Sequence, residues 1–116
     1  MEFNNTIPIY LQVINDIKHE IVAGGLMLGE KLPSGRELAL KYKINPNTSN
    51  RIYKELEAEQ LCFTKRGLGT FITENKETVV MIKKEMAEKL LNEFIEGMKK
   101  LGYTSKEIIE ILQTKL

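Results

Sequence analysis

Residues 32–72 read LPSGRELALKYKINPNTSNRIYKELEAEQLCFTKRGLGTFI, and this segment decides the fold of the chain. It holds two helix-start signals, followed by two β-rich runs that flank a glycine-containing loop. Two short capped helices followed by a tight hairpin are typical of a winged helix-turn-helix. In such a unit one helix can enter the major groove of DNA while the hairpin tip lies beside it.

The two helices are predicted from their capping residues. Ser34 precedes Glu37 by three positions, the spacing of a capping box in which each side chain accepts a hydrogen bond from the other residue's backbone N–H. Asn45 followed by Pro46 supplies a second N-cap acceptor and a proline at the first helical position. Because Pro46 disfavours helical dihedrals at Asn45, the two helices are expected to turn sharply against each other.

The apolar residues of the segment predict the buried faces of both helices. Leu38 and Ala39 are expected to be buried on the first helix, and Ile52, Tyr53 and Leu56 recur at helical spacing on the second. This arrangement leaves a row of polar side chains mostly outward on the second helix: Asn47, Thr48, Asn50, Arg51 and Lys54.

A hairpin is predicted after the second helix, from residues 61–64 and 70–73, with a basic loop over residues 65–69. A two-stranded ribbon is marginal alone, so Leu61, Phe63 and Phe71 are expected to anchor it on the helical core. Lys31 and Leu32 are expected to form a brief edge strand.

Amphipathic helices are predicted on both sides of this segment. The first opens with Pro8 at its first helical position and ends at Gly24 and Gly25, and its apolar stripe comprises Tyr10, Val13, Ile14, Ile17 and Ile21. A long helix from about Lys76 is closed by Gly102, and its wide apolar face comprises Val79, Ile82, Met86, Leu90, Phe94 and Met98, with Val80, Ala87, Leu91, Ile95 and Leu101 beside them.

The chain is expected to end in a two-helix hairpin, because Thr104 and Glu107 form another capping box. Such a hairpin would leave many large apolar side chains in water, so we expect its face to meet a second copy of the chain. The predicted fold class is mainly α with a small β-hairpin: a winged helix-turn-helix domain over residues 1–75, followed by a C-terminal two-helix dimerisation hairpin over residues 76–116.

Composition limits the chemistry that the chain can perform. Seventeen Lys and Arg stand against sixteen Asp and Glu, so bulk charge does not indicate a nucleic-acid partner. The local balance is more informative, because residues 31–66 hold Lys31, Arg36, Lys41, Lys43, Arg51, Lys54, Lys65 and Arg66 against Glu37, Glu55, Glu57 and Glu59.

The sequence predicts neither a metal site nor a cofactor. Cys62 is the single cysteine and His19 the single histidine, so no internal disulfide can form and a structural zinc site lacks ligands. We expect His19 to face solvent and Cys62 to be a packing residue in a reducing cytoplasm. No apolar run approaches the roughly 20 residues that span a bilayer, and the start of the chain is not a signal peptide, so no membrane partner is expected.

Several motifs, met in order between Pro8 and Ile72, resemble the GntR family of bacterial transcriptional regulators and its short YtrA-like subfamily: PIYLQV, LPSGRELA, INPNTSNRIYKELE and RGLGTF. The resemblance implies that Arg36 and the recognition helix from Asn45 to Lys54 face DNA, with Arg66 and Gly67 at the wing tip. The chain departs from the family at Ser49, where Val is usual, at Gly35, where a bulkier or acidic residue is common, and at Asn50, where many relatives outside the subfamily have Arg.

The predicted partner is double-stranded DNA, and the predicted contacts are Ser34, Arg36, Asn45, Asn47, Thr48, Ser49, Asn50, Arg51, Lys54, Lys65, Arg66 and Gly67. Arginine offers forked donors to guanine or phosphate, and Asn and Thr near a helix start can bind bases or phosphate oxygens. Structural alternatives remain for some of them: an ion pair for Arg36, cap and turn chemistry for Asn45, Asn47 and Thr48, and a solubilised hairpin edge for Lys65 and Arg66.

The functional prediction is a homodimeric, sequence-specific transcriptional regulator, a repressor acting on a near-palindromic operator, for which kinship suggests control of a transporter operon. The alternative is a winged-helix module that binds an acidic protein. The tail is too short for a separate sensor domain, so a small-molecule effector would bind between the subunits; Met81, Met86 and Met98 could line such a pocket or the dimer core. An enzyme is not expected, because the chain lacks a nucleophile-base pair and a phosphate-cradling loop.

Overall fold

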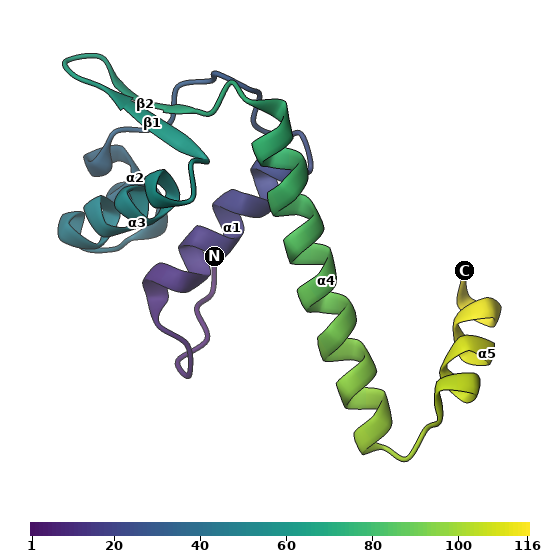
Figure 1. Ribbon diagram of the computed structural model, residues 1–116. Helices are drawn as coiled ribbons and strands as arrows, with labels where there is room; N and C mark the ends of the chain where they lie inside the picture. The colour runs from purple at the N-terminus through teal and green to yellow at the C-terminus, as the bar shows by residue number, and fades with distance from the viewer. The chain divides into compact units, whose positions relative to one another are not determined.

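The computed structural model describes residues 1–116 as five helices and one two-stranded hairpin, in the order α1–α2–α3–β1–β2–α4–α5 (Figure 1). The chain divides into two compact units, Met1–Met81 and Ile82–Leu116. The division falls inside α4 (Lys76–Lys100), whereas the sequence-based domain limit was placed at the start of that helix. The first turns of α4 therefore belong with the unit that holds the hairpin.

The first helix, α1 (Ile9–Val22), has the predicted apolar stripe, because Val13, Ile14, Ile17 and Ile21 are all buried. Pro8 is the N-cap and not the first helical residue as predicted, since its ψ of 135° is extended. After Val22 the helix ends in a turn in which the N–H groups of residues 25 and 26 donate to the carbonyl of residue 20.

The helices α2 (Gly35–Tyr42) and α3 (Pro46–Ala58) begin where their caps predict. The Ser34 hydroxyl accepts from the Glu37 N–H at 3.1 Å, and the Glu37 carboxylate accepts from the Ser34 N–H at 2.9 Å. Asn45 Oδ1 accepts from the Asn47 N–H at 2.8 Å. Between the helices Lys43 adopts left-handed backbone angles (φ 56°), which ends α2 and allows the turn.

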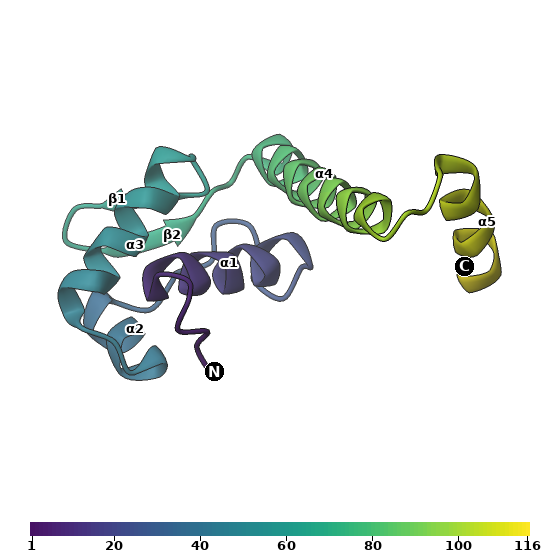
Figure 2. The ribbon, with the colours of Figure 1, turned by 90° about the horizontal axis from the view of Figure 1, so that it is seen from below.

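The core of the first unit is centred on α3, which contacts α1, α2 and β1. In Figure 2, α3 lies between α2 and the hairpin. Two tyrosines add polar ties to this core: the Tyr42 hydroxyl donates to Asp16 of α1 at 2.5 Å, and the Tyr53 hydroxyl donates to the carbonyl of Pro33. The fully buried side chains are Val13, Leu38, Ser49, Ile52, Leu56, Leu61 and Ile72.

The strands β1 (Cys62–Lys65) and β2 (Gly69–Ile72) pair antiparallel, from Cys62 opposite Ile72 to Lys65 opposite Gly69. The predicted edge strand is reduced to one bridge between Lys31 and Phe71.

The anchors of the hairpin differ from the prediction. Leu61 is buried as expected, but Phe63 and Phe71 are only partly covered and stack on each other with ring centroids 5.8 Å apart. Cys62 and Ile72 are the strand residues that enter the core, because side chains alternate between the two faces of a strand.

The second unit holds most of α4 and all of α5 (Ser105–Lys115). Gly102, with φ +95°, ends α4, and the predicted capping box of Thr104 and Glu107 starts α5. Ile108 is buried, but this unit leaves many large apolar side chains exposed: Leu90, Leu91, Phe94, Leu101, Tyr103, Ile109 and Leu116. No helix in the protein combines the length and the apolar character that crossing a bilayer demands.

Candidate nucleic-acid interface

The leading half of α3 presents the predicted row of polar side chains. Asn47, Asn50, Arg51 and Lys54 are exposed and Thr48 is half-buried, because the apolar stripe of α3 occupies the opposite side of the helix. Asn45 serves as the N-cap, which is the structural alternative for this residue. The remaining backbone N–H groups of the first turn add partial positive charge at the same end.

Ser49 corrects the sequence-based prediction, because its side chain is 0% exposed and cannot contact DNA. It precedes Ile52, Tyr53 and Leu56 by three, four and seven positions, so it lies on the buried stripe of α3. Its hydroxyl oxygen has no hydrogen-bond partner. The same helical spacing, applied to Ser49 in the sequence, could have placed it in the core.

Arg36 lies in the first turn of α2 and is exposed. The ion pairs of the chain are Lys18 with Glu59 and Lys41 with Glu20, so the guanidinium of Arg36 is not tied to a carboxylate. The free guanidinium favours the DNA-contact hypothesis over the ion-pair alternative. Ser34, beside it, uses its hydroxyl oxygen in the capping box.

The start of α2 approaches α3 closely at Gly35. A Cβ at this position would lie 3.2 Å from Asn50 Oδ1, which is tighter than an ordinary contact. The glycine therefore leaves room for the Asn50 amide beside the first turn of α2. This contact brings Asn50 next to the turn that carries Arg36.

Arg51 is exposed, yet its guanidinium lies 3.7 Å from the centroid of the Tyr10 ring. A guanidinium over an aromatic face at this distance is a cation–π contact. Tyr10 was predicted only as part of the apolar stripe of α1. Because α1 and α3 meet only in the folded unit, no local sequence pattern could reveal the pairing.

The wing tip consists of Arg66, Gly67 and Leu68, all exposed. Gly67 has φ +78° and open space around it, so the turn requires glycine-like backbone angles and leaves the tip accessible. Lys65 extends back along the strands, with its ammonium 5.6 Å and 5.3 Å from the ring centroids of Phe63 and Phe71. Arg66 is thus the more outward of the two predicted basic residues of the wing.

Lys31 was not among the predicted site residues, but it lies against the wing. A Cβ on Gly69 would be 2.9 Å from Lys31 Cε, and Lys31 forms the isolated bridge to Phe71. The edge strand predicted at Lys31 could have indicated this position, because a strand that pairs with the hairpin brings its side chains next to the wing.

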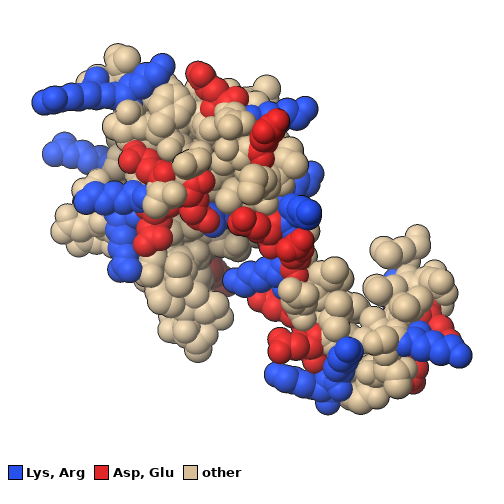
Figure 3. Space-filling view, in the orientation of Figure 1, with Lys and Arg blue, Asp and Glu red and all other residues tan.

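The charges of the first unit are unevenly distributed. Figure 3 shows Lys and Arg side chains projecting from the edge that carries α2, α3 and the hairpin, while acidic side chains gather toward the middle of the face. In the capping box of α2, hydrogen bonds from the Ser34 backbone N–H and hydroxyl hold the pKa of Glu37 below its usual value. Glu37 Oε1 accepts the hydrogen bond from the Ser34 N–H and so takes part in the cap.

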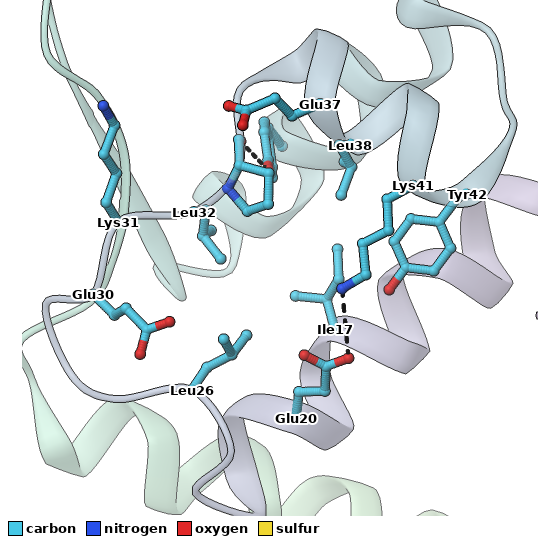
Figure 4. A pocket seen from close by; sticks show the side chains of 12 residues that line it. Ile17, Glu20, Leu26, Glu30, Lys31, Leu32, Glu37, Leu38, Lys41 and Tyr42 are labelled. Atoms are coloured by element: carbon cyan, nitrogen blue, oxygen red, sulfur yellow. Dashed lines mark hydrogen bonds and ion pairs between the residues drawn. The ribbon is translucent and has the colours of Figure 1, made fainter.

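A cavity of about 460 Å³ lies in the same unit, between α1, α2 and the segment that joins them. Figure 4 shows Leu26, Leu32 and Ile17 pointing into it, with Glu30, Lys31 and Glu37 around its rim. Lys41 and Glu20 approach across one side at 3.9 Å. The hydroxyl groups of its two buried tyrosines, Tyr42 and Tyr53, already donate to Asp16 and to the Pro33 carbonyl, and its charged groups lie at the rim. Groups of three His, Cys, Asp or Glu side chains suited to a metal are absent.

Similarity to known proteins agrees with this geometry. The model of the bacterial regulatory proteins of the gntR family matches residues 9–72. The HTH-type transcriptional regulator YhcF of Bacillus subtilis is 42% identical over 113 residues, which cover 97% of this chain and 93% of YhcF. The HTH-type transcriptional repressor YtrA of the same organism is 40% identical over 109 residues, covering 87% of this chain and 84% of YtrA.

Solved structures extend the likeness to the second unit. A GntR family transcriptional regulator from Listeria monocytogenes superimposes with a TM-score of 0.90 at 39% identity, covering 97% of this chain and 98% of that one. The motifs, the winged helix-turn-helix and these similarities over nearly the full length all agree. This chain belongs to the GntR family of transcriptional regulators, which bind DNA and are not enzymes.

Proposed function

We propose that this regulator acts as a homodimeric repressor on a near-palindromic operator. The observation that carries the proposal is the exposed row Asn47, Asn50, Arg51 and Lys54 on α3, flanked by the unpaired Arg36 and by the wing tip. A helix bearing such a row fits the major groove, with the wing beside it. Repression is proposed because the relative YtrA, 40% identical, is named a repressor.

The dimer is proposed from the second unit. Leu90, Leu91, Phe94 and Ile109 are all exposed there, with between 36% and 60% of their surface open. Burial of apolar surface stabilises by about 25 cal/mol per Å², so covering these side chains with a second copy would supply a large driving force. A two-fold dimer presents two recognition helices to two half-sites, which is why the operator should be near-palindromic.

The remaining parts of the proposal concern partners and place of action. Double-stranded DNA is the partner of the first unit, and a second copy of the chain is the partner of the second. We place the activity in the cytoplasm, where a bacterial regulator meets its operator. Control of a transporter operon, and an effector bound between subunits, extend the proposal from the subfamily resemblance.

Selection from sheared genomic DNA tests this function. The full-length protein should enrich discrete fragments, whose footprints show two related half-sites, and binding should weaken steeply as salt rises because Lys and Arg displace counterions from phosphates. Enrichment of no sequence at either of two salt concentrations would contradict the proposal. It would then favour a module that binds an acidic protein through the same basic surface.

Arg36→Ala sharpens the test. The variant should bind the enriched fragment about 1 to 3 kcal/mol more weakly with its thermal melt unchanged. Lys41→Ala is the matched control. The substitution removes the same charge from the same helix, but Lys41 lies near Glu20 and is not a predicted DNA contact. Equal affinity of wild type and Arg36→Ala would remove Arg36 from the interface.

A further inference from the structure

Tyr10 and Arg51 form a contact in which a predicted DNA-binding side chain of α3 is held by a residue of α1. Tyr10 is half-buried at the start of α1, and Arg51 is exposed on α3. The guanidinium carbon lies 3.7 Å from the centroid of the ring. Arg51 makes no ion pair with a carboxylate.

The stack restrains Arg51 without using its hydrogen-bond donors. Contact through the face of the planar guanidinium leaves its five N–H groups, which lie in the plane, free to reach an acceptor at its edge. A long, exposed arginine would otherwise sample many rotamers, and fixing it on binding would cost conformational entropy. Because the Tyr10 ring already restricts the rotamers of Arg51 in the free protein, less conformational entropy is lost when a ligand binds.

The side of α3 on which Arg51 is held indicates the kind of acceptor. Arg51 is drawn toward α1, whereas Asn50 lies against the first turn of α2. A side chain tied to a neighbouring helix has less reach toward the floor of the groove, where base edges lie, and is better placed for the phosphates along its rim. Backbone phosphates accept charge-assisted hydrogen bonds from such a fork.

We propose that Tyr10 is a positioning residue of the DNA interface, whose ring holds Arg51 ready to bind a backbone phosphate. The proposal rests on the proposed function and extends the interface to the start of α1. It assigns the tyrosine of the PIYLQV motif a role beyond packing.

The test uses the duplex that wild-type protein enriches most strongly from a random-sequence library. Tyr10→Leu keeps an apolar side chain but removes the aromatic face, and it should weaken binding about threefold to tenfold. Tyr10→Phe keeps the face and should bind like wild type. Arg51→Ala should weaken binding at least as much as Tyr10→Leu and should lower the salt dependence by about one phosphate contact.

The double variant decides whether Tyr10 acts through Arg51. In the Arg51→Ala background, Tyr10→Leu should have no further effect on the dissociation constant, since the group that it positions is absent. Independent, additive losses would overturn the proposal. A loss in Tyr10→Phe equal to that in Tyr10→Leu would also overturn it, because the hydroxyl would then be the contacting group.

Other outcomes separate this inference from the proposed function. If Tyr10→Leu does not fold, as judged by circular dichroism, Arg51→Ala still decides, because unchanged binding by that variant overturns the proposal. If wild type binds and Arg36→Ala weakens it while Arg51→Ala does not, only the role of Tyr10 and Arg51 fails. If wild type enriches no duplex, the proposed function itself fails.

Discussion

Ser49 places a hydroxyl group where the packing of α3 calls for an apolar side chain. It is fully buried, its oxygen has no partner, and its neighbours on the stripe are Ile52, Tyr53 and Leu56. A buried polar group without a hydrogen bond costs about 1 to 3 kcal/mol. The family's usual Val at this position fits the environment better, so this chain carries a small defect inside its recognition helix.

Ser49→Ala should therefore stabilise the protein. Removing the orphan hydroxyl and adding a better helix former should raise the free energy of unfolding by about 1 kcal/mol, measured by urea denaturation. Ser105→Ala, at the exposed first residue of α5, makes the same chemical change on a helix without removing a buried hydroxyl. A less stable Ser49→Ala variant would show that the hydroxyl has a partner after all.

Cys62 should be chemically quiet in the folded protein. Burial, and to a lesser degree the nearby Glu57, raise the pKa of the thiol to about 12 from its ordinary 9.0. The nucleophilic thiolate is therefore scarce at pH 8 to 9. Iodoacetamide should label native protein far more slowly than protein in denaturant, as followed by mass spectrometry. Equal rates would mean that the strand opens readily.

The same shift has a direct consequence for stability. A group whose pKa is raised on folding contributes stability that is complete below its unfolded pKa and is lost as the pH rises toward the folded value. For Cys62 that window runs upward from pH 9.0 to about 12. Cys62→Ala should therefore lose stability less steeply than wild type across this window.

At the scale of elements, capping hydrogen bonds decide where α2 and α3 begin. The box of Ser34 and Glu37 starts α2, and Asn45 starts α3. These caps are local, with donor and acceptor only two or three residues apart, and that is why the sequence alone predicts both helix starts. The turn between the two helices, on which the direction of the polar row of α3 depends, lies between the left-handed Lys43 and the Asn45 cap.

Replacing the α2 cap separates its structural role from DNA contact. Ser34→Ala should destabilise the protein by about 1 kcal/mol, whereas Ser34→Asp keeps a cap acceptor and should melt close to wild type. The aspartate adds a negative charge one residue from Gly35 and two from Arg36, so it should still weaken DNA binding. Full affinity in Ser34→Asp would place the start of α2 away from the phosphates.

Elements that depend on distant contacts were predicted less well. Leu61, Cys62 and Phe63 form a continuous apolar run, so the sequence alone cannot tell which face of the strand is buried. In the structure the face that carries Cys62 and Ile72 is buried. Phe63 and Phe71 lie on the opposite face, where they stack on each other. The stack of Arg51 on Tyr10 was missed for the same reason, because it forms only when α1 and α3 meet.

At the scale of the whole molecule, the second unit is the part of the chain from which we propose a dimer. Only Ile82 and Ile108 are buried among its large apolar side chains, and most of the others are exposed. Contiguous exposed apolar surface on a small unit is typical of a protein interface. We therefore expect the apolar residues of α4 and α5 to become the core of the dimer.

A charge introduced on this surface should break the dimer. Phe94→Asp should shift the protein from dimer to monomer in sedimentation velocity, because an unpaired carboxylate would be buried at the interface. Affinity for an operator with two half-sites should fall at least tenfold, since the two DNA-binding units are no longer linked. Asn92→Asp, at an exposed polar residue of α4, adds the same charge as a control. A dimeric Phe94→Asp variant would contradict this interface.

The hydrogen bond from Tyr53 to the carbonyl of Pro33 has a thermodynamic consequence. It joins α3 to the residue before the N-cap of α2, so we expect the two helices to keep this arrangement when the protein binds DNA. Calorimetry should then record a heat capacity change no larger than rigid docking requires, without the extra contribution of a segment that folds on the duplex.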